Sequence, residues 1–357
     1  SSLQSAINAA VPGDTLVLQA GATYTGMVTL PARQGSEPIT ITSSSAASLS
    51  AGVRVNPSKA PYMARIVGPN GAAVVFEMRA RNYRLIGLEI TGASGSYAAA
   101  DIVAVGSGAT TNAADLPSDI VLDRLWIHGD STYGAKRGVS MNGVRVTVSN
   151  SYISSIKGTW QETQALCAWN TPGPLQVENN YLEASGISIL IGGAEPAIPG
   201  VTPSDVVVTG NRFFKPAQWI GTGLMMKHHL ELKTGRRVTI KGNLFEQNYG
   251  QPFINLKVGT ENINTPAITS DVTIENNIFR KAQAGIWVSG RNSTGGKLSN
   301  ITVRNNLFDE MTAEWGGPWT LFLVQDGVQG ITIENNTTGP TAYSFFLLSD
   351  LTPSTGL

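Results

Sequence analysis

Hydrophobic and polar residues alternate in short runs along most of the chain, and one such run recurs at nearly constant spacing. Each copy carries aliphatic residues at every second position, then Asn-Asn or Gly-Asn, then a further apolar pair. Alternation with a period of two is typical of a β-strand with one buried face. Asn and Gly accept the left-handed backbone conformation that a sharp corner requires. The pattern therefore predicts two short strands joined by a corner in each copy.

The spacing of the copies indicates the architecture. The clear copies are Leu175–Leu182, Val206–Phe213, Val238–Phe245, Val272–Phe279, Ile301–Phe308 and Ile331–Thr338, and weaker ones are Ile120–Ile127 and Val146–Ile153. The second corner position recurs every 29–34 residues, at Ser151, Asn180, Asn211, Asn243, Asn277, Asn306 and Asn336. A repeat of this length is typical of a solenoid, in which each copy buries its apolar face against its neighbours.

A third β-prone run precedes most copies, so each repeat holds three short strands. These runs are Leu166–Trp169, Ser188–Ile191, Leu230–Lys233, Phe253–Lys257, Gly285–Val288 and Thr320–Val324. The sequence therefore predicts an all-β fold, a right-handed parallel β-helix, with the corner asparagines stacked as a hydrogen-bonded ladder. A β-propeller would need hairpins that the sequence lacks, and the Leu-x-x-Leu-x-Leu frame of leucine-rich repeats is absent.

The two ends of the chain differ. Residues 1–20 form an amphipathic segment, a Pro-Gly turn and a strand, which predicts an N-terminal helix that caps the first rung. Phe345–Leu348 predicts a last rung strand without a C-terminal cap, so we expect a longer native chain, a covering partner or self-association at the open C-terminal rung. We expect one domain over residues 1–357. The missing initiator Met is typical of a cleaved signal peptide or a trimmed chain.

Composition excludes several classes of function. Charged residues make up only 14% of the chain and balance to a net charge of zero, whereas nucleic-acid binding requires a basic stripe. The sequence shows no polybasic membrane patch and no long apolar run, so we expect no membrane contact. The one cysteine, Cys167, lies in an apolar strand and is predicted to be a packed core residue.

A packed β-helix must carry its function on an outer face or in its loops. If Leu230 and Leu232 point inward, then His229, Glu231 and Lys233 point outward from one strand. The same alternation exposes Asn255 and Lys257 one rung later and Trp287 in the rung after that, while Trp169 ends a strand two rungs earlier. A cationic patch edged by aromatic rings suits an anionic polysaccharide.

Two parts of the sequence resemble known enzymes. Leu3–Leu18 with Gly21–Gly26 resembles the start of right-handed β-helix polysaccharide-degrading enzymes, nearest to the alginate-lyase and chondroitinase-B-type lyases of the pectate-lyase-like superfamily. Residues 160–249 also resemble a group of secreted bacterial β-helix proteins. His229–Phe245 resembles the lyase segment in which Lys233 matches the catalytic base. Pro252–Gly259 resembles the strand that carries an Arg-His pair, with Lys257 at the Arg position and no His after it.

The resemblance also bears on metal binding. Metal-dependent members carry an acidic pair just upstream of the lysine, and here those positions hold Met226 and His228. His228 and His229 are neighbours on a predicted strand, so they point to opposite faces and cannot easily share one ion. The sequence thus requires no cofactor and predicts no metal ligands, while the resemblance leaves Ca²⁺ open.

These features predict a polysaccharide lyase that acts by β-elimination on a uronic-acid polymer. Two adjacent lysines lower each other's pKa, so one of them could act as the base. The other would hold the substrate carboxylate. The predicted catalytic residues are Lys233, Lys257, Glu231 and Arg237, and the predicted substrate-binding residues are Trp169, His229, Asn255, Trp287 and Arg236. Two alternatives remain: a glycoside hydrolase with Glu231 paired to Glu195, and a non-catalytic carbohydrate-binding or surface-structural solenoid. Each implies a secreted, extracellular or periplasmic protein.

Overall fold

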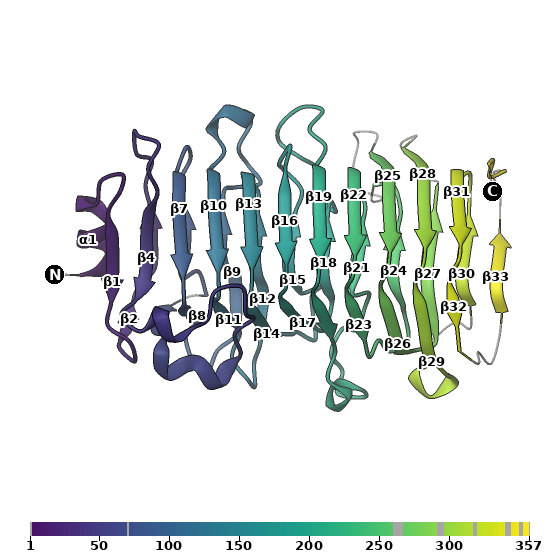
Figure 1. The fold of residues 1–357 in the computed structure, drawn as a ribbon, viewed down its shortest axis with the longest axis horizontal. Helices are drawn as coiled ribbons and strands as arrows, with labels where there is room; N and C mark the ends of the chain where they lie inside the picture. Colours follow the sequence, from purple (N-terminus) through teal and green to yellow (C-terminus); the bar gives the residue numbers. More distant parts are fainter. Residues whose placement is uncertain are drawn as a thin grey trace.

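The computed structural model describes residues 2–69, 71–259, 267–290, 296–316, 320–339, 344–349 and 353–356. Within these ranges the chain forms three parallel sheets of 11 strands each, and it visits the three sheets in turn (Figure 1). Each strand pairs with the strand that comes three strands later in the chain, so each circuit through the three sheets makes one rung. The predicted right-handed parallel β-helix is confirmed.

Within each sheet the strands lie side by side in the order in which they follow one another along the chain. The first sheet contains β1 (Thr15–Leu18), β4 (Ile39–Ser43), β7 (Arg81–Ile86), β10 (Ser118–Asp123), β13 (Val144–Ser149), β16 (Leu175–Glu178), β19 (Ser204–Thr209), β22 (Gly235–Lys241), β25 (Ile268–Glu275), β28 (Lys297–Arg304) and β31 (Gln329–Glu334). The second sheet contains β2 (Thr23–Thr25), β5 (Ala64–Gly68), β8 (Leu88–Gly92), β11 (Trp126–His128), β14 (Tyr152–Ile156), β17 (Tyr181–Ala184), β20 (Arg212–Phe214), β23 (Leu244–Glu246), β26 (Ile278–Ala282), β29 (Leu307–Met311) and β32 (Thr337–Thr338). The third sheet contains β3 (Val28–Leu30), β6 (Val74–Phe76), β9 (Ala98–Val105), β12 (Ala135–Met141), β15 (Gln164–Ala168), β18 (Ile187–Ile191), β21 (Leu230–Leu232), β24 (Pro252–Leu256), β27 (Ala284–Ser289), β30 (Thr320–Gln325) and β33 (Ser344–Ser349).

Helices are short and lie outside the sheets. They are α1 (Leu3–Ala9) and the 3₁₀ turns η1 (Ala46–Ser48), η2 (Pro57–Tyr62), η3 (Ala113–Asp115), η4 (Ala217–Trp219) and η5 (Ala313–Trp315). Two of these turns lie in the loop after β4, where the composition of residues 43–60 predicts a loop. No helix among the described residues is both long enough and apolar enough to cross a membrane.

The core consists of rows in which equivalent residues of successive rungs touch. Phe213, Phe245, Phe279 and Phe308 stack face to face, with ring centroids 4.3, 4.7 and 4.7 Å apart. The predicted aliphatic rows are equally buried, at Val206, Val208, Val238, Ile240, Val272 and Ile274. Each fully buried side chain of this kind stabilises the fold by roughly 1.5–3 kcal/mol.

The corner asparagines form the predicted ladder between the first and second sheets. Oδ1 of Asn277 accepts hydrogen bonds from the backbone N and from Nδ2 of Asn243, at 2.9 and 3.0 Å. Nδ2 of Asn277 donates to the carbonyl of Ile240 and to Oδ1 of Asn306. The same pattern continues from Ser151 to Asn336, one rung at a time. The ladder satisfies buried backbone groups that no strand reaches.

The residue before each ladder position makes the corner itself. Asn179, Asn276 and Asn305 have φ between 52° and 56°, and Gly210 and Gly242 take the same place with φ of 65° and 63°. These values lie in the left-handed region, where only Gly and a short polar side chain such as Asn are readily accommodated. This conformation explains why the motif alternates between Asn-Asn and Gly-Asn.

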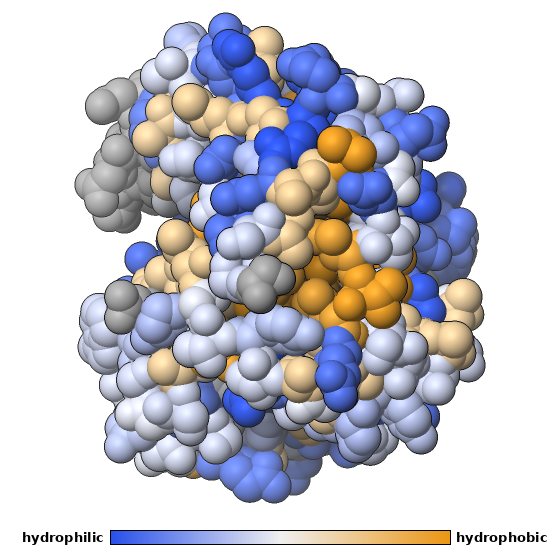
Figure 2. All heavy atoms as spheres, turned by 90° about the vertical axis from the view of Figure 1, so that its left-hand side faces the viewer, coloured by the Kyte–Doolittle hydropathy of each residue, from blue (hydrophilic) through white to orange (hydrophobic). Residues whose placement is uncertain are grey.

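Helix α1 covers part of the first rung, as predicted. Ile7 is buried in the core, and the side chain of Gln4 both accepts from the backbone N of Thr29 and donates to its carbonyl, at 2.8 and 3.0 Å. Gln4 thus pairs with edge strand β3 in place of a preceding rung. Figure 2, viewed from this end, shows apolar surface in the middle of the face with polar atoms around it.

At the other end, β33 pairs with β30 and its side chains are exposed. Phe345, Phe346, Leu347 and Leu348 are each between 43% and 48% exposed. The strand matches the predicted last rung, and association through it stays a prediction.

Replacing a ladder asparagine should destabilise the fold, whereas replacing its neighbour should not. Asn277→Ala removes the acceptor of a buried backbone N–H, and we expect the free energy of unfolding to fall by about 1–3 kcal/mol or more. Asn276→Gly, in the same corner, should change it little, because Gly already occupies this position in two other rungs. Urea unfolding monitored by circular dichroism measures both, and equal effects of the two substitutions would contradict the ladder's role.

Candidate functional site

The outer face of the third sheet brings the predicted polar residues together. Strand register places Glu231 beside Asn255 and Asn255 beside Trp287, so these three side chains form one row across β21, β24 and β27. Lys233 and Lys257 lie two residues further along the first two of these strands. Neighbouring rungs are about 4.8 Å apart, which puts the five side chains within reach of one another.

A buried carboxylate forms the centre of this face. Oε1 of Glu231 lies 3.3 Å from Nζ of Lys257 and accepts a hydrogen bond from Nδ2 of Asn255 at 2.9 Å. Oε2 lies 3.6 Å from Nζ of Lys233. The side chain of Glu231 is 3% exposed, that of Lys233 is 11% exposed and that of Lys257 is 35% exposed. The two lysines therefore share one counter-ion, and Lys257 is the more accessible.

The surrounding charges keep Glu231 ionised. Burial acts to raise the pKa of this carboxyl, but the ammonium groups of Lys233 and Lys257 hold its pKa below the usual range. Oε2 receives no hydrogen bond from any described residue, so it retains acceptor capacity. We call Glu231, Asn255, His228, Lys233 and Lys257 the Glu231 cluster.

His228, and not His229, belongs to this cluster. Nδ1 of His228 lies 3.2 Å from the carbonyl of Pro252, and Nε2 lies 3.3 Å from Nδ2 of Asn255. Because a carbonyl only accepts, Nδ1 carries the proton and Nε2 accepts from Asn255. Burial lowers the pKa of His228 to about 4, which agrees with a neutral ring.

The predicted outward orientation of His229 is wrong. Its ring is fully buried and stacks on Phe253 with centroids 5.7 Å apart, and Leu230 is buried in the core as well. Two consecutive side chains thus point inward just where β21 begins, so strict alternation fails there. The expectation that the two histidines face opposite sides holds.

Arg236 and Arg237 lie outside the Glu231 cluster. Both belong to β22 of the first sheet, beyond the corner that follows Lys233. Arg237 makes a two-pronged ion pair with Asp205 of the preceding rung, with contacts of 2.7 and 2.8 Å. The predicted catalytic role of Arg237 and the predicted substrate-binding role of Arg236 do not fit this cluster, because the chain turns into another sheet before it reaches them.

The two predicted tryptophans flank the cluster on the same face. Trp287 follows Asn255 in register, and its Nε1 is buried without a partner among the described residues. Trp169 lies two rungs before Lys233, and the guanidinium of Arg137 lies 5.4 Å from its ring centre. Cys167 is buried, but it packs with Leu190 beneath Trp169 on the outer face and not in the main core.

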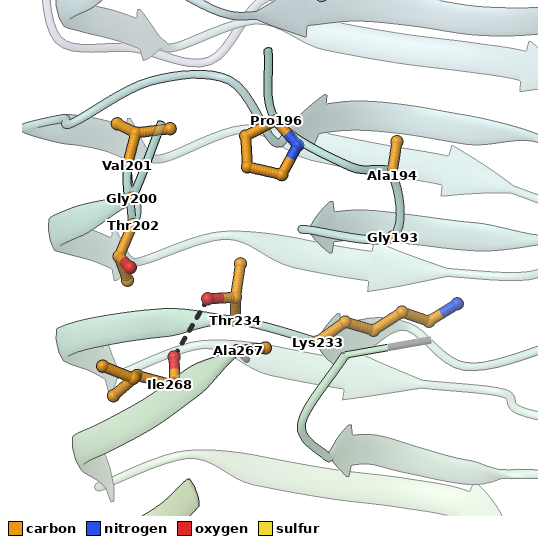
Figure 3. A pocket seen from close by; sticks show the side chains of 10 residues that line it. All are labelled: Gly193, Ala194, Pro196, Gly200, Val201, Thr202, Lys233, Thr234, Ala267 and Ile268. Atoms are coloured by element: carbon orange, nitrogen blue, oxygen red, sulfur yellow. Dashed lines mark hydrogen bonds between the residues drawn. The ribbon is translucent and has the colours of Figure 1, made fainter. Parts of the chain in front are cut away.

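A pocket of about 190 Å³ adjoins the cluster at the corner after β21. Residues from the loop after β18 and from two strand ends line it, namely Gly193, Ala194, Pro196, Gly200, Val201, Thr202, Lys233, Thr234, Ala267 and Ile268. Figure 3 shows the Lys233 side chain running along the edge of this pocket, with Nζ pointing away from Thr202 and Ile268. Glu195, the predicted partner of Glu231 in a hydrolase, is exposed on the same loop.

The Glu231 cluster does not fit a calcium ion. Ca²⁺ takes six to eight oxygen ligands, whereas the cluster offers one carboxylate whose oxygens already face two ammonium groups. In the described part of the chain, no group of three or more His, Cys, Asp or Glu side chains is arranged to hold a metal.

A second polar cluster, on the second sheet, was missed by the sequence reasoning. Glu89 lies 2.9 Å from Arg65 and 3.1 Å from His128, and the ring of His128 stacks on Trp126. Arg65, Trp126 and His128 line a pocket of about 240 Å³, together with Asp130. The residues come from three rungs in which the repeat motif is weak, so no sequence signal joined them.

Comparison with known proteins identifies the fold and no family. No family model matches the sequence, and no curated protein matches it. Among solved structures, PfbA, a surface adhesin of Streptococcus pneumoniae, aligns with a TM-score of 0.54 and 14% identity over 96% of this chain and 87% of its own. DFA-IIIase from Arthrobacter chlorophenolicus A6 gives 0.51 and 13% over 94% and 77%, and an alginate lyase from Paenibacillus sp. str. FPU-7 gives 0.46 and 16% over 98% and 94%. The similarities to PfbA and to DFA-IIIase extend along most of each chain, and they show a shared fold alone.

The neutral, buried His228 should make stability depend on pH. Its native pKa of about 4 lies below the unfolded value of 6.5, so between these values the unfolded state binds the extra proton and stability falls as the pH falls. From about pH 7.5 to about pH 5, His228→Gln should therefore lose about 2 kcal/mol less stability than the wild type. Urea unfolding at both pH values measures this difference. Equal acid losses in the two proteins would contradict the buried neutral ring.

Proposed function

We propose that the chain is a polysaccharide lyase that cleaves a uronic-acid polymer by β-elimination on the outer face of the third sheet. The observation that carries this proposal is the pair of lysines on adjacent rungs, within 3.6 and 3.3 Å of one buried carboxylate. Elimination next to a uronate requires a cation at the substrate carboxylate and a base at the C5 proton. The Glu231 cluster supplies nitrogen groups for both positions.

Lys257 is the group proposed to hold the substrate carboxylate. Its side chain is the more exposed of the two lysines, and a cation at that carboxylate makes the C5 proton more acidic. Lys233, in its amine form, is proposed to take this proton, a role supported by its match to the base of the lyases that the segment resembles. The electron pair of the former C5–H bond then forms the C4–C5 double bond while the C4–O bond breaks. Lys233 passes the proton that it has taken to the departing oxygen.

Glu231 and its hydrogen-bond partners are proposed to position the lysines. The carboxylate lies between Nζ of Lys233 and Nζ of Lys257, and Asn255 links it to the neutral ring of His228. Positioned groups of this kind lower the cost of reaching the reactive geometry.

Trp169 and Trp287 border the same face and would contact neighbouring sugar units. A polymeric substrate of this class places the protein outside the cytoplasm, in a secreted or periplasmic location.

A glycoside hydrolase would need a protonated acid as well as a second carboxylate. Glu231 fits the acid role poorly, because its pKa is held below the usual range. A hydrolase that uses Glu195 with Glu231 and a binding protein without activity are the two alternatives that the experiment below distinguishes from a lyase.

The test compares variants on alginate, polygalacturonate, hyaluronan and chondroitin. We expect the wild type to release products that absorb in the ultraviolet, because only elimination creates a conjugated double bond. Lys233→Ala should lower turnover roughly a hundredfold or more, and Lys257→Ala should also raise KM. Lys241→Ala, on the first sheet and paired with Glu275, is the matched control and should behave as wild type.

The other outcomes separate the alternatives. Products without the new absorbance, with Glu231→Gln inactive and both lysine variants active, would establish a hydrolase instead. Absence of any product on the whole panel would contradict catalysis on these polymers.

A further inference from the structure

Trp160 is the most unusual exposed residue near the third sheet. It lies in the loop between β14 and β15, its side chain is 66% exposed, and it belongs to no repeat motif. Single exposed apolar residues are common on protein surfaces and carry no meaning by themselves. Trp160 differs because its ring packs on Tyr97 of a neighbouring loop.

Residues 160, 161 and 162 each contact another loop. The ring of Trp160 packs on Tyr97, with centroids 5.4 Å apart, and Nε2 of Gln161 donates to the Tyr97 hydroxyl at 2.6 Å. Glu162 forms an ion pair with Lys227, which immediately precedes His228 of the Glu231 cluster. The loop is thus fixed on both sides, and one of these contacts leads directly to the candidate site.

Arg137 connects this aromatic pair to the sheet face. Its guanidinium lies over Trp169 at 5.4 Å and binds Gln164 and Asp101, at 2.9 and 3.2 Å. Gln161, which binds the Tyr97 hydroxyl, lies three residues before Gln164, which binds Arg137, so one short segment makes both contacts. Trp160, Tyr97, Arg137 and Trp169, which we call the aromatic-arginine cluster, therefore form one connected group.

The position of this cluster suits a polymer. Strand β12, which carries Arg137, lies three rungs before β21, which carries Glu231. Three rungs span about 14 Å, which is longer than a single sugar ring. An exposed aromatic ring held in place offers a flat apolar surface at little entropic cost, and an arginine beside it can bind hydroxyl or carboxylate oxygens.

We infer that the aromatic-arginine cluster is a second carbohydrate subsite, which binds a pyranose unit of the polymer several units away from the bond cleaved at the Glu231 cluster. This inference rests on the proposed function for the identity of the polymer. It assigns to Trp160 a role in holding long substrates and none in the elimination itself.

The test is native affinity electrophoresis in gels that contain alginate, polygalacturonate or hyaluronan. In a gel that retards the wild type, Trp160→Ala should bind roughly fivefold or more weakly, the loss expected for one aromatic contact. Tyr62→Ala removes an exposed aromatic ring from the loop before β5 and should bind as wild type. The urea midpoint of Trp160→Ala should match that of the wild type, which would show that the fold is intact.

Each result decides between the two proposals. Undiminished retardation of Trp160→Ala, or no retardation of the wild type in any of the three gels, would overturn the subsite. If Trp160→Ala binds as wild type while Lys233→Ala abolishes the unsaturated product, the subsite is wrong and the lyase stands. If Trp160→Ala weakens binding while the wild type forms no unsaturated product, the subsite stands and elimination is wrong.

Discussion

Parallel pairing between neighbouring rungs is the constraint on which the rest of this structure depends. Except at the two ends of each sheet, every strand hydrogen-bonds to the strands of the rungs before and after it, so equivalent positions align in rows along the helix. Inside, the rows become stacks such as the four phenylalanines. At one corner they become the asparagine ladder. Outside, the same register brings Glu231, Asn255 and Trp287 side by side, although they come from three different repeats.

The Glu231 cluster shows how this register concentrates charge. A carboxylate that is almost fully buried is costly unless cations and hydrogen-bond donors surround it. Here each of those groups comes from β21, from β24 or from the residues that directly flank these strands, and a shift of one residue in register would turn them into the core. The same geometry leaves Oε2 of Glu231 without a hydrogen bond from the described residues, and it leaves Lys257, beside Oε1, accessible. The accessible ammonium group of Lys257 suits an anionic group of a ligand.

Sequence reasoning succeeded where the repeat is regular. The Asn-Asn corners, the aliphatic rows and the position of Lys233 near Lys257 all follow from a period of about 30 residues and a side-chain period of two. It failed where the alternation of inward and outward side chains breaks. His229 points inward beside Leu230, and no residue type in this segment indicates that irregularity. It misplaced Arg237 because the corner after Lys233 leads into another sheet. Trp160 could not be found, since loop contacts such as that between Tyr97 and Gln161 join residues that are 64 positions apart.

The central claim is that the outer face of the third sheet around Glu231 binds an anionic sugar chain. A crystal structure of Lys233→Ala soaked with an eight-unit oligomer of mannuronate or galacturonate tests it most directly. We predict a sugar carboxylate within hydrogen-bond distance of Nζ of Lys257, with the chain crossing the strands toward Trp169. A sugar chain bound at the second sheet beside Glu89 and His128, or a Glu231 face left without sugar, would contradict the account.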